Sequence, residues 1–211
     1  MPRITQERRA ATRAVIVGAA RRCFSRDGFH QTSMPDIAVE AGLSTGAAYR
    51  YFASKEELIL EIARDAFHMI FEPIIALLDR EEPIGVADLV AASISPEGPT
   101  VQRDAAGNEV PADELFRCAV QAWAELLRHD GLRDSANQGF DTIRGRMADA
   151  LRRGQQKGAA PEDMDPERSS RVLMALLHGF VLQRVAFGLK DSEGFARDER
   201  GVLADIYILR R

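Results

Sequence analysis

The chain has 211 residues, of which 45% are hydrophobic and 28% charged, a composition typical of a soluble globular protein with one or two compact domains. Its net charge of −4 is unevenly divided, because residues 1–55 hold nine Lys and Arg against four Asp and Glu. This end therefore carries +5 and the remaining 156 residues carry −9. A basic end joined to an acidic body fits a local phosphate-binding surface, although ordinary scatter of charge would also give this division.

The composition argues against a secreted, membrane-spanning or metal-binding protein. Cys23 and Cys118 lie far apart in apolar helical patterns and are expected to be core residues rather than a disulfide. The four histidines lack the spacing of metal ligands, so no metal and no cofactor is expected. The first residues carry no signal-peptide stretch, and the longest apolar run, residues 172–182, is too short to cross a membrane. We expect a cytoplasmic protein.

The chain begins with a polar, basic segment, residues 1–8, which is either a mobile arm or a frayed terminus without a role. A first helix is predicted from about residue 7 to residue 26, where apolar side chains recur at spacings of three and four. Gly28 is expected to end this helix, with Phe29 packing back against it.

Residues 32–57 have the pattern of two short helices joined by a tight turn and followed by the start of a third helix. Ser33 and Asp36 can cap the first of these helices, and Gly42 suits the left-handed residue that ends it. Ser44 is expected to cap a second helix at about residues 45–52, and a further cap begins the third. Helix, glycine-containing turn and helix is the helix-turn-helix signature.

The second of these helices exposes an unusual surface, with small residues at 45–48 and aromatic and basic residues at 49–51. Short side chains and Arg suit base edges, while Tyr hydroxyls and Arg suit phosphates. We therefore expect this helix to enter a major groove of DNA. The alternative is a buried corner of a helical protein with two structural tyrosines.

A long helix is predicted from about residue 55 to residue 79, amphipathic in its first half and almost wholly apolar in its second. Leu58 and Ile62 are expected to pack under the DNA-binding head, whereas Phe71 enters a larger hydrophobic body. Pro73 is expected to kink the helix, because it removes a backbone donor. We interpret this helix as the mechanical link between two domains.

The rest of the chain is predicted to be helical apart from residues 95–111, which break every pattern and are expected to form a loop, either mobile or a lid. The helices are predicted at about 86–94, from Pro111 or Ala112 to about 127, at 132–157, at 166–188 and at 195–209. The helix at 166–188 is apolar nearly all round and needs cover on both sides. The predicted fold is all-α, with a three-helix head at residues 1–54, a helical body at residues 55–211 and about nine helices in total.

Catalysis is not expected. The sequence contains no nucleophile-elbow motif, no phosphate-binding loop of the Walker type, no zinc-protease motif and no CxxC.

Residues 13–62 resemble the N-terminal domain of the tetracycline-repressor (TetR) family of transcriptional regulators. The matching residues include Ala19, Ala20, Phe24, Gly28, Phe29, Thr32, Ser33, Asp36, Ile37, Ala38, Ala41, Gly42, Leu43, Ser44, Gly46, Tyr49, Tyr51, Phe52, Ser54, Lys55, Glu56, Glu57 and Leu58. The position of Ala47 often carries Thr in the family, so one possible hydroxyl contact to DNA is absent. The resemblance implies a small-molecule pocket in the C-terminal body, while the remaining residues show only the length and helical texture of the family.

Three sets of candidate site residues follow. Base contacts are expected from Thr45, Gly46, Ala47 and Arg50, phosphate contacts at the matching family positions Tyr49, Tyr51 and Lys55, and further DNA contacts from Thr32, Ser33 and Ser44. Candidates for the ligand pocket are Phe67, Phe71, Phe116, Trp123, Phe140, His178 and Gln183. Candidates for a dimer interface are Leu173, Leu177, Phe180, Val181, Arg184, Val202 and Ile206. The polar His178 and Gln183 on an apolar helix need a ligand, a neighbouring helix or the dimer mate as partner.

The function predicted from these residues is a ligand-responsive repressor that binds a palindromic operator as a homodimer and is released by a largely apolar small molecule. The alternative is a helical interaction protein, or a module that binds double-stranded DNA without sequence choice or effector control. No membrane partner is expected.

Overall fold

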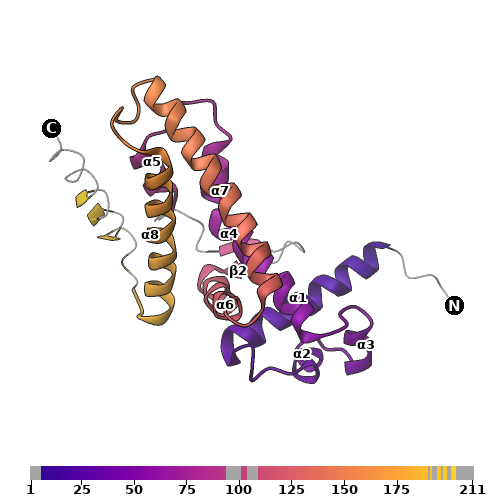
Figure 1. The fold of residues 1–211 in the computed structure, drawn as a ribbon. Helices are drawn as coiled ribbons and strands as arrows, with labels where there is room; N and C mark the ends of the chain where they lie inside the picture. The colour runs from indigo at the N-terminus through magenta and orange to yellow at the C-terminus, as the bar shows by residue number, and fades with distance from the viewer. Residues whose placement is uncertain are drawn as a thin grey trace. The chain divides into compact units, whose positions relative to one another are not determined.

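The computed structural model describes residues 6–93, 101–103, 109–189, 191, 194–195, 197–198 and 201–202 (Figure 1). These residues form eight α-helices and two short strands, so the all-α prediction is confirmed apart from one hairpin. The elements are α1 (Gln6–Asp27), α2 (Met34–Glu40), α3 (Thr45–Tyr49), α4 (Lys55–Leu78), α5 (Val86–Ser93), β1 (Val101–Arg103), β2 (Glu109–Pro111), α6 (Ala112–Glu125), α7 (Asp130–Gln156) and α8 (Pro166–Ala186).

Most helix bounds lie close to the predicted ones, and two differences matter. The helix α3 ends at Tyr49, three residues before the predicted end, and Arg50 is its C-cap residue. The predicted ninth helix at 195–209 lies largely outside the described residues, although those described from 194 to 202 are helical. Pro73 lies inside α4, which continues to Leu78.

The predicted loop at 95–111 contains a β-hairpin, which corrects the expectation that no strand is present. The strands β1 and β2 pair antiparallel, with Val101 opposite Pro111 and Arg103 opposite Glu109. Each strand has only three residues, too few for an alternating pattern to be recognised in the sequence. Val110 is fully buried and anchors the second strand.

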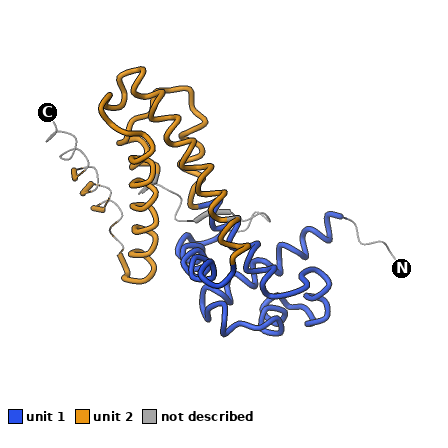
Figure 2. The backbone as a smooth tube through the Cα atoms, in the orientation of Figure 1, with its two compact units in different colours: residues 1–69, 99–129 blue, residues 70–98, 130–211 orange. Residues whose placement is uncertain are grey.

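The chain divides into two compact units (Figure 2). Unit 1 comprises residues 1–69 and 99–129, and unit 2 comprises residues 70–98 and 130–211. This division differs from the predicted boundary after residue 54, because α6 packs against α1 within unit 1. The boundary between the units falls inside α4.

The core of unit 1 is built from α1, α2, α4 and α6. Phe24, Ile37 and Phe52 are fully buried in it, and Leu58 and Ile62 of α4 pack into the same cluster, as predicted. Cys23 and Cys118 are both free and buried in this cluster, which confirms that they are core residues. Unit 1 therefore has a continuous hydrophobic core to which both α4 and α6 contribute.

Unit 2 is built around the pair α7 and α8, with α5 packed on α8. Phe71, Leu89, Met147 and Leu151 are almost completely buried there. Gly154 on α7 permits a close approach, since a Cβ at this position would lie 2.1 Å from the carbonyl oxygen of Ile84.

Candidate DNA interface and candidate ligand site

The helix-turn-helix caps form as predicted. The side chain of Ser33 accepts a hydrogen bond from the amide of Asp36 at 3.4 Å, and the carboxylate of Asp36 accepts one from the amide of Ser33 at 2.8 Å. The hydroxyl of Ser33 also donates to the carboxylate of Asp36, at 2.5 Å. This bond and the one from the Ser33 amide lower the pKa of Asp36, because both favour its charged form. The N-terminus of α2 is therefore held by a complete capping box.

The turn between α2 and α3 has the left-handed glycine that the sequence predicts. Gly42 has a φ of 66°, and the amide of Leu43 bonds to the carbonyl oxygen of Ala38 at 2.9 Å. Ser44 then caps α3, since its hydroxyl accepts from the amide of Ala47 at 3.2 Å. The two helices are thus joined at an angle that local chemistry sets on both sides of the turn.

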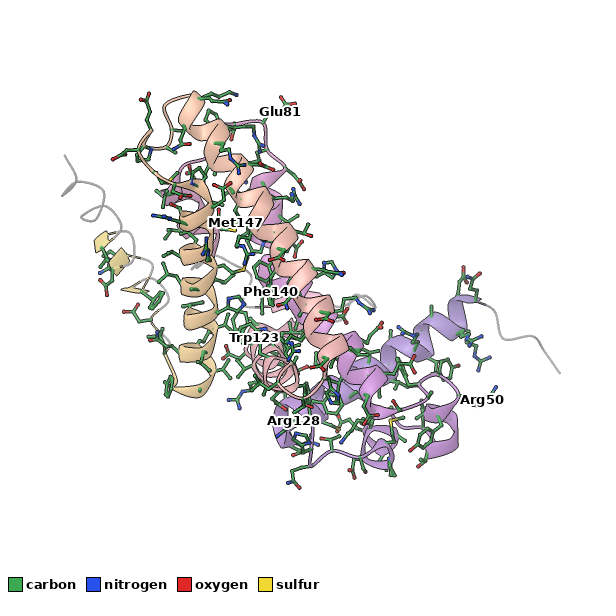
Figure 3. All side chains as sticks on the ribbon, viewed as in Figure 1. Arg50, Glu81, Trp123, Arg128, Phe140 and Met147 are labelled. Atoms are coloured by element: carbon green, nitrogen blue, oxygen red, sulfur yellow. The ribbon has the colours of Figure 1, made fainter. Side chains whose placement is uncertain are left out.

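The outward side of α3 carries most of the residues predicted to read DNA. Ser44, Gly46, Tyr49 and Arg50 are exposed, and Arg50 projects from the end of α3 (Figure 3). Thr45, Ala47 and Tyr51 are half-buried. The opposite side of the helix is anchored by Ala48, which is fully buried in the core of unit 1. This arrangement presents short side chains, one tyrosine and one arginine to solvent.

Thr32 and Lys55 are already engaged within the head. The hydroxyl of Thr32 donates to the carbonyl oxygen of Gly28 at 2.8 Å, and this side chain is buried. The ammonium of Lys55 donates to the carbonyl oxygens of Phe29 at 2.8 Å and Thr32 at 3.1 Å. Sequence reasoning missed this role, because the partners of Lys55 lie more than 20 residues earlier in the chain.

A shallow hollow of about 380 Å³ lies beside these groups on the surface of the head. Ser33, Tyr49 and Lys55 all line it, together with His30 and Ser54. Thr32 lines it as well, so the structure brings four of the predicted DNA contacts together around one depression at the starts of α2 and α4.

Much of the basic charge of the first 55 residues is paired inside unit 1. Arg13 of α1 bonds to Glu61 of α4 and lies 4.6 Å from the ring centre of Phe52. This hydrogen bond lowers the pKa of Glu61 below its usual range. Arg21 likewise pairs with Glu114 of α6 at 2.6 Å. The net charge of the segment thus overstates the positive charge that the head presents to a partner.

Three of the seven predicted ligand-site residues lie together in unit 2. The ring centres of Phe71 and Phe140 are 5.9 Å apart, and that of His178 lies 5.1 Å from Phe140 and 6.4 Å from Phe71. Figure 3 labels Phe140 on α7. We call these three residues the aromatic cluster. It combines apolar ring faces with one titratable group.

The protonation state of His178 follows from its surroundings. Its Nδ1 atom lies 2.7 Å from the carbonyl oxygen of Met174, and since a carbonyl can only accept, Nδ1 carries a proton. Burial lowers the pKa of His178, because the charged imidazolium is poorly solvated there. The side chain is therefore a neutral imidazole at neutral pH, with Nε2 as an acceptor.

The other four predicted ligand-site residues are not part of the aromatic cluster. Phe67, Phe116 and Trp123 belong to unit 1, and all three are half-buried. Gln183 is exposed on α8, so solvent can satisfy its amide. The sequence alone did not separate these residues, since aromatic side chains at helical spacing look alike whichever unit they join.

The burial of His178 predicts a dependence of stability on pH. Its folded-state pKa is lowered, so the unfolded chain binds more protons as the pH falls through the usual His range near 6.5. We expect the free energy of unfolding to decrease from pH 7.5 to 5.5, and His178→Phe to reduce this decrease. Urea denaturation at several pH values measures this free energy. An equal pH dependence in the variant and the wild type would contradict the assignment.

The predicted dimer residues of α8 are mostly buried within the chain. Leu173, Leu177, Phe180 and Val181 expose 5% or less of their surface, and the ring of Phe180 lies 5.3 Å from that of Phe195. Arg184 is half-buried, Val202 is exposed, and Ile206 lies outside the described residues. The four buried side chains offer little surface to a second copy in this structure, and their part in a dimer interface stays a prediction.

A different side of α8 is exposed. Val172 and Leu182 expose 51% and 41% of their surface, and Ala175 and Ala186 are also exposed, with half-buried Gly179 between them. We call these five residues the α8 stripe. Their spacing of three and four residues places them on one side of the helix. The sequence did not reveal which side of α8 is exposed, because α8 is apolar nearly all round and has no distinct polar face.

The α8 stripe lies beside a charged hollow of about 580 Å³ formed by α7 and α8. Its lining residues include Asp141, Arg144, Asp149, Arg152, Glu167 and Arg171. Arg152 pairs with both Asp149 and Glu167, which joins the two helices.

Two protein-family models match this chain, one in its N-terminal part and one in its C-terminal part. Residues 16–62 match the family described as bacterial regulatory proteins of the tetR family, and residues 107–198 match the BetI-type transcriptional repressor C-terminal family. None of the helices in the described ranges is long and apolar enough to cross a membrane.

Individual relatives match over nearly the whole chain. The HTH-type transcriptional regulator UidR of Escherichia coli K12 is 30% identical over 199 residues, which is 92% of each chain. TtgR of Pseudomonas putida is 28% identical over 86% of this chain and 83% of its own length.

Solved structures show the same fold. GusR of Salmonella enterica has a TM-score of 0.71 at 26% identity and covers 96% of this chain and 97% of its own. A transcriptional regulator from Saccharomonospora viridis in complex with choline has a TM-score of 0.72 at 22% identity over 92% and 96%.

The family expected from residues 13–62 is thus confirmed, and with it the prediction that the protein is not an enzyme. The capped helix-turn-helix lies within the residues that match the first family, and the helices α6 to α8 lie within those that match the second. The chain belongs to the TetR family of helix-turn-helix transcriptional regulators.

Proposed function

We propose that the protein represses transcription by binding a palindromic DNA operator as a homodimer, and that a largely apolar small molecule in its C-terminal region releases it. The observation that carries the proposal is the exposed side of α3, which two caps and the buried Ala48 hold outward. Such a regulator acts where the DNA is, in the cytoplasm.

Sequence choice by this regulator is assigned to α3. Its small residues Thr45, Gly46 and Ala47 let the helix approach the base edges, and Arg50 can donate two hydrogen bonds to a guanine. Tyr49 and Ser33 border the hollow of the head and are proposed to bind phosphates. Lys55 is proposed to hold the segment before α2, with any phosphate contact secondary to that role.

The test is selection of bound sequences from random duplex DNA with wild-type protein, followed by the same selection with Arg50→Ala. We expect one palindrome for the wild type and relaxed preference at one base pair of each half-site for the variant, at a cost of about 1–3 kcal/mol. Arg153→Ala, which removes an exposed arginine from α7, is the matched control and should keep the wild-type preference. Binding of all sequences alike, lost at moderate salt, would favour the non-specific DNA-binding module instead.

Dimerisation is assigned to the α8 stripe. Exposed apolar and small residues along one side of a helix suit close packing against the same helix of a second copy. Two-fold symmetry would then place the two heads on half-sites about 34–36 Å apart or a multiple of that distance. The charged hollow beside the stripe supplies a polar rim for such an interface.

The effector is assigned to the surroundings of the aromatic cluster. Phe71 and Phe140 favour an apolar or aromatic ligand, and the neutral His178 can accept one hydrogen bond from it. Choline, which the Saccharomonospora viridis protein binds, is a useful test compound, since a quaternary ammonium can also lie against aromatic faces.

The release mechanism is assigned to α4, which carries Leu58 and Ile62 in the core of unit 1 and Phe71 in the core of unit 2. A ligand beside Phe71 can bias α4 only by its differential affinity for two states, about 1–3 kcal/mol, or a 5- to 150-fold change in operator affinity. Reciprocity requires operator DNA to weaken ligand binding by the same factor. If operator DNA leaves the affinity for an identified ligand unchanged, the α4 mechanism is wrong.

A further inference from the structure

The segment between α1 and α2, residues 28–32, is held by side chains from elsewhere in unit 1. We call this segment the 28–32 turn. The amide of Phe29 donates to Oε1 of Gln121 on α6 at 2.8 Å. The carbonyl oxygen of the same residue accepts from Lys55 on α4 at 2.8 Å. The backbone of one residue of the turn, Phe29, is thus bound from two other helices.

Gln121 also closes the end of α1. Its Nε2 atom donates to the carbonyl oxygen of Phe24 at 2.9 Å, which the amide of Gly28 also approaches at 2.9 Å. The orientation of the side-chain amide is therefore determined, since Phe29 N–H can only donate and the Phe24 carbonyl can only accept. Groups at the end of a helix need such partners, and here α6 supplies them for α1.

The contact between α6 and α1 is rich in polar groups along one side of α6. Glu114 pairs with Arg21, the thiol of Cys118 lies 3.7 Å from the carbonyl oxygen of Arg21, and Glu125 lies 3.1 Å from Nε2 of His30. Hydrogen bonds weaken steeply as their distance grows and their angle departs from linear. A small movement of α6 would consequently break contacts to the 28–32 turn.

The 28–32 turn leads directly into the DNA-binding elements. The carbonyl oxygen of Thr32 accepts from Lys55 at 3.1 Å, and the next residue, Ser33, is the N-cap of α2. The hollow on the head is lined by residues 30–34 together with Tyr49 and Lys55. The position of this turn therefore sets where the N-terminus of α2 lies.

We infer that Gln121 is a positioning residue for DNA binding, which holds the 28–32 turn, and through it the N-terminus of α2, in the geometry that binds the operator. Gln121 acts through the turn and does not itself touch DNA. The inference rests on the proposed function, in which α2 and α3 bind an operator, and it adds a residue far from them in sequence.

Gln121→Glu separates this role from simple packing. An ionised carboxylate can accept from Phe29 but repels the carbonyl oxygen of Phe24, whereas a protonated carboxyl can donate to that oxygen and restore both bonds. We expect the variant to bind the selected operator about 3- to 10-fold more weakly than wild type at pH 8, as for one lost hydrogen bond. The deficit should shrink as the pH is lowered towards 4.5.

Ala124→Glu is the matched control, because it adds the same charge at an exposed position of α6 one turn away. Other charged or titratable groups also surround the turn, namely Lys55, His30, Glu125 and Arg128. Because these groups are present in wild type too, each affinity is divided by that of wild type at the same pH. Amide hydrogen exchange of Phe29 gives a direct readout. It should accelerate in Gln121→Met, which loses both hydrogen bonds, and stay slow in the control.

The outcomes separate the two proposals. If Phe29 exchange accelerates in Gln121→Met while its operator affinity equals that of the control, Gln121 is structural and the inference is wrong, but operator binding stands. A deficit in Gln121→Glu that does not change with pH also overturns it. If wild type itself prefers no sequence, the proposed function fails first. Should Gln121→Met not fold, the pH profile of Gln121→Glu still decides.

Discussion

Leu182→Asp is expected to convert the proposed dimer into monomers and to lower operator affinity about 10²- to 10⁴-fold, the usual gain from linking two binding sites. Leu182 belongs to the α8 stripe and exposes 41% of its surface. The single-chain fold therefore loses little from the substitution, whereas a self-complementary interface would bury two carboxylates against apolar groups. Light scattering at micromolar concentration measures the mass, and a binding titration measures the affinity.

Two variants act as controls for this experiment. Leu127→Asp makes the same change at a leucine of unit 1 that exposes 85% of its surface, and it should remain a dimer. Phe180→Asp should instead lower the stability of the chain, because Phe180 is buried against Phe195. A monomeric wild type, or a Leu182→Asp variant that stays dimeric, would contradict the assignment of the α8 stripe.

Arg21→Met is expected to lower the free energy of unfolding by about 3 kcal/mol, near the lower end of the range for breaking a buried ion pair. Only 5% of the Arg21 side chain is exposed, and Glu114 would keep a poorly solvated carboxylate without its cation. The positive charge of Arg21 also acts on Asp65 of α4. Burial raises the pKa of Asp65, and Arg21 offsets part of this rise. Urea denaturation monitored by circular dichroism gives the free energy.

The comparison that isolates the buried charge is the double variant Arg21→Met with Glu114→Leu. Replacing both partners by apolar groups removes the stranded carboxylate, so much of the lost stability should return. Arg22→Met is the neighbouring control, because the Arg22–Glu40 pair is largely exposed and such pairs contribute about 0–1 kcal/mol. Equal losses for Arg21→Met and Arg22→Met would show that the burial of the pair has no energetic consequence.

The helix-turn-helix and its family could be predicted from the amino-acid sequence alone. The capping box of Ser33 and Asp36, the left-handed Gly42 and the cap of Ser44 are all local, since each partner lies within five residues of the other. Local hydrogen bonds and backbone preferences need no tertiary contact to be predicted. The burial of Cys23 and Cys118 was likewise readable, because both lie in apolar helical patterns.

The covered side of α8 and the long-range hydrogen bonds that hold unit 1 together could be identified only in the folded chain. An almost uniformly apolar helix has no periodic contrast, so Val172 and Leu182 could not be distinguished from Leu173 and Phe180. Gln121 and Phe29 are 92 positions apart, and Lys55 and Phe29 are 26 positions apart. A side-chain hydrogen bond to a distant backbone group leaves no pattern in the sequence, because any polar residue on that face of the helix would look the same before the chain folds.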